Sequence, residues 1–148
     1  MVEKNKNEIR TSVFLRKLLN APEIENFIES NSQEMEHPSF DAYITNMCKK
    51  TGKVPEQVIK NSAIERTYGH QLFNGTRKPS RDKVIQLAFG FNLDLEETQK
   101  LLQIAQKNPL YPKIKRDAAI IYYINKHKDI FEMQYILQSL KLTLLGGD

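Results

Sequence analysis

The chain has 148 residues, of which 40% are apolar and 27% charged, and its formal net charge at pH 7 is +4. This balance is typical of a globular protein rather than a disordered one, and the length allows one ordinary core with helical additions. No apolar run approaches the roughly 20 residues of a membrane span, and residues 1–10 lack the apolar centre of a signal peptide. We therefore expect a cytoplasmic protein with no membrane partner.

The first predicted elements are two short helices, in residues 13–19 and 23–30. Apolar side chains then recur at helical spacing in residues 40–47, with Ser39 well placed as N-cap and Gly52 as the stop signal. A third segment predicts a helix before it breaks near Ser62-Ala63, and it starts at Pro55, a residue suited to the first turn.

A second short helix follows the break and closes at Asn74-Gly75, with Ile64 expected to be buried in the turn between the two. Two short helices held at a steep angle by a tight turn can place the second helix in the major groove of DNA. Next to the stop lie two cations, Arg77 and Lys78. This segment predicts a DNA-binding module.

Four more helices are predicted downstream. Residues 84–91 repeat the apolar pattern, and residues 95–105 follow a capping box formed by Asp94 and Glu97. The stretch 108–112 interrupts because its two prolines cannot sit inside a helix. One helix then runs through Ile120, Ile121 and Ile124, and a last one is capped by Asp129 with Glu132. The tail, Gly146–Asp148, is predicted to be disordered.

The sequence offers no metal site, cofactor site or catalytic group. Cys48 is the only cysteine, so it cannot form an internal disulfide. The three histidines are scattered along the chain: His37, His70 and His127. The densest acid cluster, Glu34 with Glu36 and Asp41, falls in a polar connector rather than on one helical face. We expect no enzyme, no metal and no cofactor.

The charges are unevenly distributed. Residues 20–45 contain six acids and no lysine or arginine, whereas residues 66–83 contain five cations against Asp82 alone. Such a layout suits a polyanionic partner on one face. It predicts double-stranded DNA as the partner of the cationic segment.

The run Asn74-Gly75-x-Arg77-Lys78-Pro79-Ser80, followed by an apolar helix ending in residues 92–97, resembles the helix-turn-helix domain of the phage-repressor and Cro type, the XRE family. Val58, Ile64 and Leu72 match its apolar positions. The resemblance covers a little under half of the chain. The flanking segments are similar to helical additions in stand-alone Gram-positive members, through Leu110-Tyr111-Pro112 and residues 116–120.

No stretch of the sequence alternates apolar and polar residues as a strand would, so we expect an all-α fold. The resemblance implies that it is built on a five-helix lambda-repressor-like domain in residues 38–107. A helical extension in residues 1–37 and a C-terminal helical pair in residues 108–148 would flank it. It also implies a sequence-specific transcriptional regulator, repressor-like in fold, that inserts the helix around residues 65–74 into the major groove.

Three positions depart from the family pattern. Ile59 stands where alanine is usual, and Gly69 stands where valine or isoleucine is usual. Because these positions face each other, we predict that the large residue fills the space left by the small one. Pro55 replaces a glutamine that braces the DNA backbone in relatives. These departures, with the acidic segment, favour an alternative in which the fold docks a partner protein.

We predict two sets of contact residues. The candidate base readers are Arg66, Thr67, His70 and Gln71, since arginine can bridge guanine and glutamine can bridge adenine. The candidate backbone contacts position the module without reading sequence. They are Tyr68, Asn74, Thr76, Arg77, Lys78, Ser80 and Arg81.

Two protein interfaces are also predicted. The C-terminal helices carry more apolar surface than a monomer needs, through Ile120, Ile121, Tyr122 and Tyr123, and this predicts a homodimer. In the adaptor alternative, the acidic N-terminal region or the C-terminal helix pair binds a partner protein instead.

Overall fold

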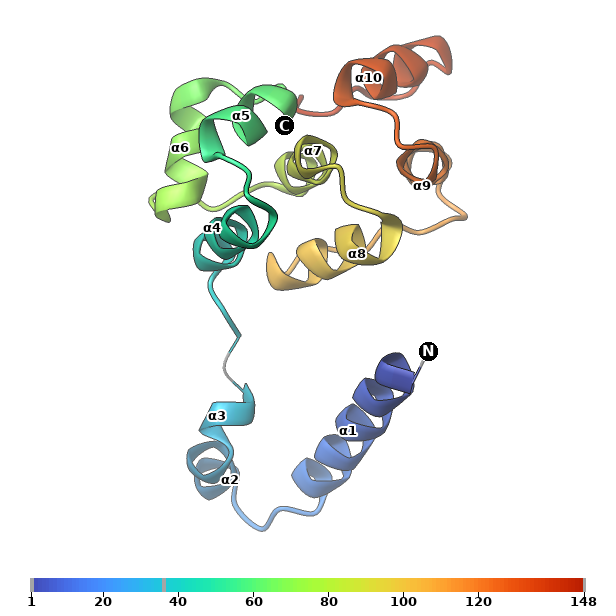
Figure 1. Cartoon of the computed structure of the whole chain (residues 1–148). Helices are drawn as coiled ribbons and strands as arrows, with labels where there is room; N and C mark the ends of the chain where they lie inside the picture. The colour runs from blue at the N-terminus through green and yellow to red at the C-terminus, as the bar shows by residue number, and fades with distance from the viewer. Residues whose placement is uncertain (1, 36, 148) are drawn as a thin grey trace. The chain divides into compact units, whose positions relative to one another are not determined.

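The computed structural model describes residues 2–35 and 37–147, with side chains from Thr11 onward, and within them the chain forms ten helices and no strand (Figure 1). The predicted all-α class is confirmed. None of the described helices is long and apolar enough to cross a membrane. The chain divides into two compact units, residues 1–37 (unit 1) and 38–148 (unit 2).

Unit 1 is a small helical hairpin with almost no core of its own. It contains α1 (Val2–Leu19), α2 (Ile24–Ser30) and the short α3 (Ser32–Met35), which the sequence patterns did not predict. Phe14 meets Phe27 edge to face, with ring centroids 5.3 Å apart. Of the side chains described in this unit, Phe27 alone is buried.

Unit 2 is built around one central helix. From Val84 to Phe91 every residue of this helix, α7, is buried, and it contacts α5, α8 and α10. A helix that is apolar on nearly all sides belongs in a core. The helices of the unit are α4 (Phe40–Thr51), α5 (Pro55–Asn61), α6 (Arg66–Asn74), α7 (Arg81–Phe91), α8 (Leu95–Ile104), α9 (Lys115–Asn125) and α10 (Ile130–Ser139).

The predicted helix ends are confirmed where the caps can be tested. Ser39 accepts a hydrogen bond from the backbone N–H of Ala42, and Gly52 ends α4 in the left-handed region. The capping box begins α8, as predicted from Asp94 and Glu97. Asp129 opens α10 with the same reciprocal arrangement. These local signals place the boundaries of three helices.

Helix α7 supports the turn between α5 and α6 through hydrogen bonds and close packing. Gln86, which is 2% exposed, donates from its amide to the carbonyl oxygens of Ser62 and Ala63, at 3.2 and 3.3 Å. A Cβ on Gly90 would lie 1.9 Å from the hydroxyl oxygen of Ser62, so only glycine allows α5 to come this close. Ile64 is buried in the turn, as predicted.

Ile59 and Gly69 are partners across α5 and α6, as predicted from the size exchange. A Cβ on Gly69 would lie 2.4 Å from the Cγ2 atom of Ile59, which is 3% exposed. The close packing of α5 against α6 therefore requires glycine at position 69. The isoleucine fills the space between the two helices.

Two crossed ion pairs join the C-terminal helices to α7. The guanidinium of Arg81 donates to the carboxylate of Asp117, and the guanidinium of Arg116 donates to the carboxylate of Asp82. Each carboxylate is almost fully buried, so both need their partners. Two consecutive residues of α7 are thus paired with two consecutive residues of α9. Helices α9 and α10 belong to the same compact unit as α5 and α6.

The C-terminal tail is folded back onto this junction. Leu145 is buried, and its backbone N–H and carbonyl both bond to the side-chain amide of Gln134. The N–H of Gly146 donates to Asp82 at 3.1 Å. The prediction of a disordered tail was therefore wrong at Gly146. The sequence pattern could not show that the buried carboxylate of Asp82 accepts a hydrogen bond from this residue. Asp148 lies outside the described residues.

The Ile59–Gly69 contact predicts a compensating pair of substitutions. Ile59→Ala should lower the free energy of unfolding by about 2–5 kcal/mol, since it opens a cavity. Gly69→Val should also destabilise the native chain, because its side chain would overlap Ile59. In the Ile59→Ala background the same valine should restore stability. Urea unfolding of the four proteins measures the cycle, and additive losses would contradict the contact.

The buried Asp82 predicts a specific loss of stability in acid. Burial raises the pKa of Asp82, but hydrogen bonds from Arg116 and from the N–H of Gly146 outweigh burial and hold the pKa below its ordinary range. Since the folded pKa is the lower one, this contribution is complete above the unfolded pKa and is lost as the pH falls through the folded value, from about pH 5 downward.

Asp82→Asn should therefore cost about 3–5 kcal/mol at neutral pH, because it leaves Arg116 without its partner charge. The difference in free energy of unfolding between the variant and the native protein should decrease as the pH falls. Urea unfolding at neutral and acidic pH gives both values. Glu96→Gln, at an exposed position of α8, is the matched control. If its free energy of unfolding, compared with that of the native protein, depended on pH in the same way, the loss of stability in acid could not be assigned to Asp82.

Candidate nucleic-acid interface

Helix α6 lies at the surface of unit 2 and exposes one of its own faces. Arg66 and Thr67 are exposed, while His70 and Gln71 are partly exposed. The opposite face of the helix carries Gly69 and Leu72, which are buried. The four candidate base readers therefore come together on one helix and remain accessible from outside the unit.

Two of these four side chains are held by one carboxylate. Glu56, on the first turn of α5, accepts from Nε of Arg66 at 2.7 Å and lies 2.5 Å from Nε2 of His70. The hydrogen bond from Arg66, followed by that from His70, holds the pKa of Glu56 below its ordinary value. The same bond raises the pKa of Arg66. All three groups are substantially exposed, so this is a surface cluster and not a buried network.

A second carboxylate lies at the start of α6. Glu65 is the N-cap residue, and its side chain accepts from the backbone N–H groups of Thr67 and Tyr68 at 3.0 and 2.8 Å. These backbone hydrogen bonds lower the pKa of Glu65. Glu65 thus occupies the helix N-terminus, the position where a phosphate would otherwise bind. The amino end of α6 therefore carries a carboxylate, and the nearby charge of Arg77 also contributes to lowering its pKa.

The loop that follows α6 is cationic, and its Arg77 side chain reaches back to Tyr68 in the first turn of the helix. The guanidinium of Arg77 lies 4.2 Å from the centre of the Tyr68 ring, and the ammonium of Lys83 lies 5.3 Å from it. Stacking on the ring fixes the plane of the Arg77 side chain while its N–H edge can still donate. Tyr68 therefore works as a platform for two cations, and Lys78 is exposed beside them.

Asn74 and Thr76 shape the loop that carries these cations. The side-chain oxygen of Asn74 accepts from both the N–H and the hydroxyl of Thr76, at 2.9 and 2.7 Å. Gly75 ends α6 in the left-handed region, with φ of 83°. The N–H of Arg77 donates to the carbonyl of Gln71. Asn74 and Thr76 thus satisfy each other and fix the loop conformation.

The last two predicted backbone contacts have other partners. The hydroxyl of Ser80 caps α7 by accepting from the N–H of Lys83. Arg81 donates to the carbonyls of Asn108 and Pro109 and to the carboxylate of Asp117. The guanidinium of Arg81 is committed to the junction with α9, so the structure does not support the prediction that it contacts phosphate.

The sequence reasoning missed two residues of this face. Glu56 lies ten residues before Arg66, so sequence spacing did not connect the two. Its position in the first turn of α5, the helix that packs against α6, could have indicated the contact. Lys83 was counted as a cation but not connected to Tyr68, since the contact spans the loop between α6 and α7. The missed carboxylate matters more, because it makes the face mixed in charge.

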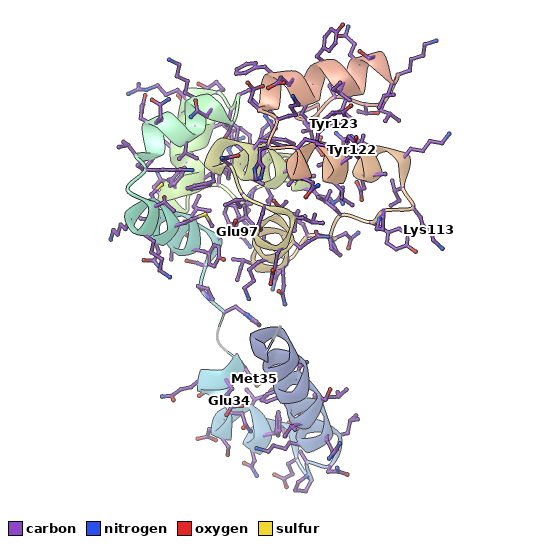
Figure 2. All side chains as sticks on the ribbon, turned by 45° about the vertical axis from the view of Figure 1, so that its right-hand side comes forward. Glu34, Met35, Glu97, Lys113, Tyr122 and Tyr123 are labelled. Carbon is purple, nitrogen blue, oxygen red and sulfur yellow. The ribbon has the colours of Figure 1, made fainter. Side chains whose placement is uncertain are left out.

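The predicted dimer residues divide between core and surface. Ile120 is fully buried, so it supports the core and the prediction of an exposed side chain there was wrong. Tyr122, 56% exposed, meets Tyr123 edge to face, and Figure 2 shows both projecting from α9. Tyr123 lines an open cavity of about 440 Å³ with Phe131 and Tyr135 of α10. The exposed apolar surface therefore lies more on α10 than on α9.

Comparison of the chain with protein-family models, with curated proteins and with solved structures finds no match.

Proposed function

We propose that the protein is a sequence-specific DNA-binding regulator of the XRE helix-turn-helix type, with α6 as the helix that enters the major groove. The observation that supports this most strongly is the organisation of α6. Its inner face packs on α5 through Gly69, and its outer face presents Arg66, Thr67 and Gln71. Two cations from the following segment, Arg77 and Lys83, lie against Tyr68 in its first turn.

Two groups of side chains would have different roles in this function. Arg77, Lys78 and Lys83, from the segment after α6, would contact phosphates, which position a module without reading sequence. Arg66 and Gln71 would read base edges through paired hydrogen bonds. Glu56 holds Arg66 before binding, so reading guanine requires Arg66 to exchange this carboxylate for the base. The exchange lowers affinity for every duplex that offers no guanine there.

A second candidate function is a protein-interaction adaptor. The observation that favours it is the exposure of aromatic side chains on α9 and α10, where Phe131 and Tyr135 are 64% and 70% exposed beside the open cavity. The dependence of duplex binding on salt separates the two functions. A DNA-binding protein loses affinity steeply as salt rises, because counterions are released at each phosphate contact.

Substitutions in the loop after α6 and on its outer face should have different effects on DNA binding. Arg77→Ala and Lys78→Ala should each weaken binding to all duplexes alike and reduce the salt slope by about one. Gln71→Ala should instead relax the preference at one base pair, worth about 1–3 kcal/mol of discrimination. Fluorescence anisotropy on duplexes selected from random DNA measures the affinity, its dependence on salt and the preference at each base pair.

Lys113→Ala, at an exposed lysine before α9, is the matched control for the loss of one charge. Unchanged duplex binding in both Arg77→Ala and Lys78→Ala would show that the proposed face is not used.

Glu56 predicts a gain of binding. Glu56→Gln should tighten binding to random duplex several-fold at low salt, since it removes a negative charge from the face and releases Arg66. Discrimination between the selected site and random DNA should decrease. Glu96→Gln removes an equal charge from an exposed position on α8 and should change neither value. Weaker binding of Glu56→Gln to random duplex would mean that the carboxylate assists rather than restrains contact.

A further inference from the structure

Unit 1 exposes most of its described apolar surface. Two apolar pairs, each spaced four residues apart, lie on its helices: Leu15 with Leu19 on α1, and Ile24 with Ile28 on α2. Their exposed fractions range from 47% to 74%. We call these four residues the N-terminal apolar face. Pairs at this spacing share one side of a helix.

Each pair lies next to the contact between α1 and α2. Phe14 and Phe27 contact each other and mark the inner side of α1 and α2. Successive residues turn by about 100° around a helix, so Leu15 and Ile28 are displaced from these phenylalanines by the same rotation.

A folded unit of this size needs a further surface. Domains below about 40 residues rarely bury enough apolar area alone, and they depend on disulfides, metals or association. The only cysteine, Cys48, lies outside unit 1, so no disulfide can staple it. With Phe27 as its one buried side chain among those described, the hairpin is completed by covering the apolar face.

The charges of unit 1 indicate which surface covers it. Helix α1 contains five cations and two acids, whereas residues 20–37 contain five acids and no lysine or arginine. The acids disfavour nucleic acid as the occupant. A second copy turned by a twofold axis brings the cationic α1 of one chain against the acidic α2 of the other, twice. Arg16, the neighbour of Leu15, would face Glu25 and Glu29, and all three are exposed.

We propose that the N-terminal apolar face is a homodimer interface, in which two hairpins pair with α1 of each copy against α2 of the other. This goes beyond the DNA-binding function and differs from the C-terminal interface expected from the sequence. A dimer formed in this way carries two α6 helices, as recognition of paired half-sites requires.

Sedimentation equilibrium of the full chain without DNA tests the interface. The native protein should form a dimer of 17.2 kDa chains. Leu15→Glu with Ile28→Glu should weaken dimerisation more than about a hundredfold, since it places charges where apolar side chains are buried. Val13→Glu, at an exposed apolar residue rotated to the other side of α1, should dimerise normally, and so should Tyr135→Glu on α10.

A native chain that stays monomeric at the highest concentration, or a dimer broken by Tyr135→Glu and not by the double variant, would overturn the proposal. Thermal unfolding of unit 2 should be unchanged in every variant, which separates loss of the interface from loss of the fold. Because dimerisation is read without DNA, its failure leaves the proposed function of α6 untouched.

A charge exchange gives a second, independent readout. Copies carrying Arg16→Glu should dimerise poorly alone, as should copies carrying Glu25→Lys and Glu29→Lys. Mixing the two should restore a heterodimer, because each cationic helix again faces an acidic one in the other chain. No restoration on mixing would show that these charges do not pair between copies.

Discussion

The close approach of α5 to α7 is the constraint on which the candidate interface depends. Gly90 removes the side chain that would collide with Ser62, and Gln86 satisfies the two carbonyls exposed by the break in the chain. With α5 fixed in this way, Ile59 determines how near α6 can lie, and Gly69 allows that distance. The orientation of α6 is therefore set by core packing beneath it, and its outer face is free to vary without loss of the fold.

A second constraint ties the C-terminal helices to the same core. Crossed ion pairs use consecutive residues of α7, Arg81 and Asp82, to hold consecutive residues of α9. Buried pairs of this kind contribute little net stability over apolar packing but penalise any arrangement that separates them. Their role is thus to specify position. They also explain why Arg81, although it opens α7 next to the cationic loop, serves the interior rather than DNA.

Much of the architecture follows from local sequence signals, and the parts that do not follow depend on contacts between distant residues. Capping residues such as Ser39 and Asp94 act within one turn, so they could be predicted from the sequence. The Ile59–Gly69 exchange could be predicted because the family resemblance supplied a spatial relation between the two positions. Burial of Ile120 and docking of Gly146 could not, since each depends on tertiary neighbours that spacing does not reveal.

The candidate site shows the same division. Position along the sequence could predict that Arg66 and Gln71 share the outer face of α6, because helical spacing is a local property. Charge counting over residues 66–83 overstated the cationic character, since it stopped one residue short of Glu65 and omitted Glu56. With both carboxylates included, acidic and cationic groups alternate over the face, and Glu56 and Glu65 offset part of the attraction that Arg66 and Arg77 exert on a phosphate backbone. Such a face suits selective contact with bases better than general adhesion to nucleic acid, because non-specific binding is supplied almost entirely by backbone charge.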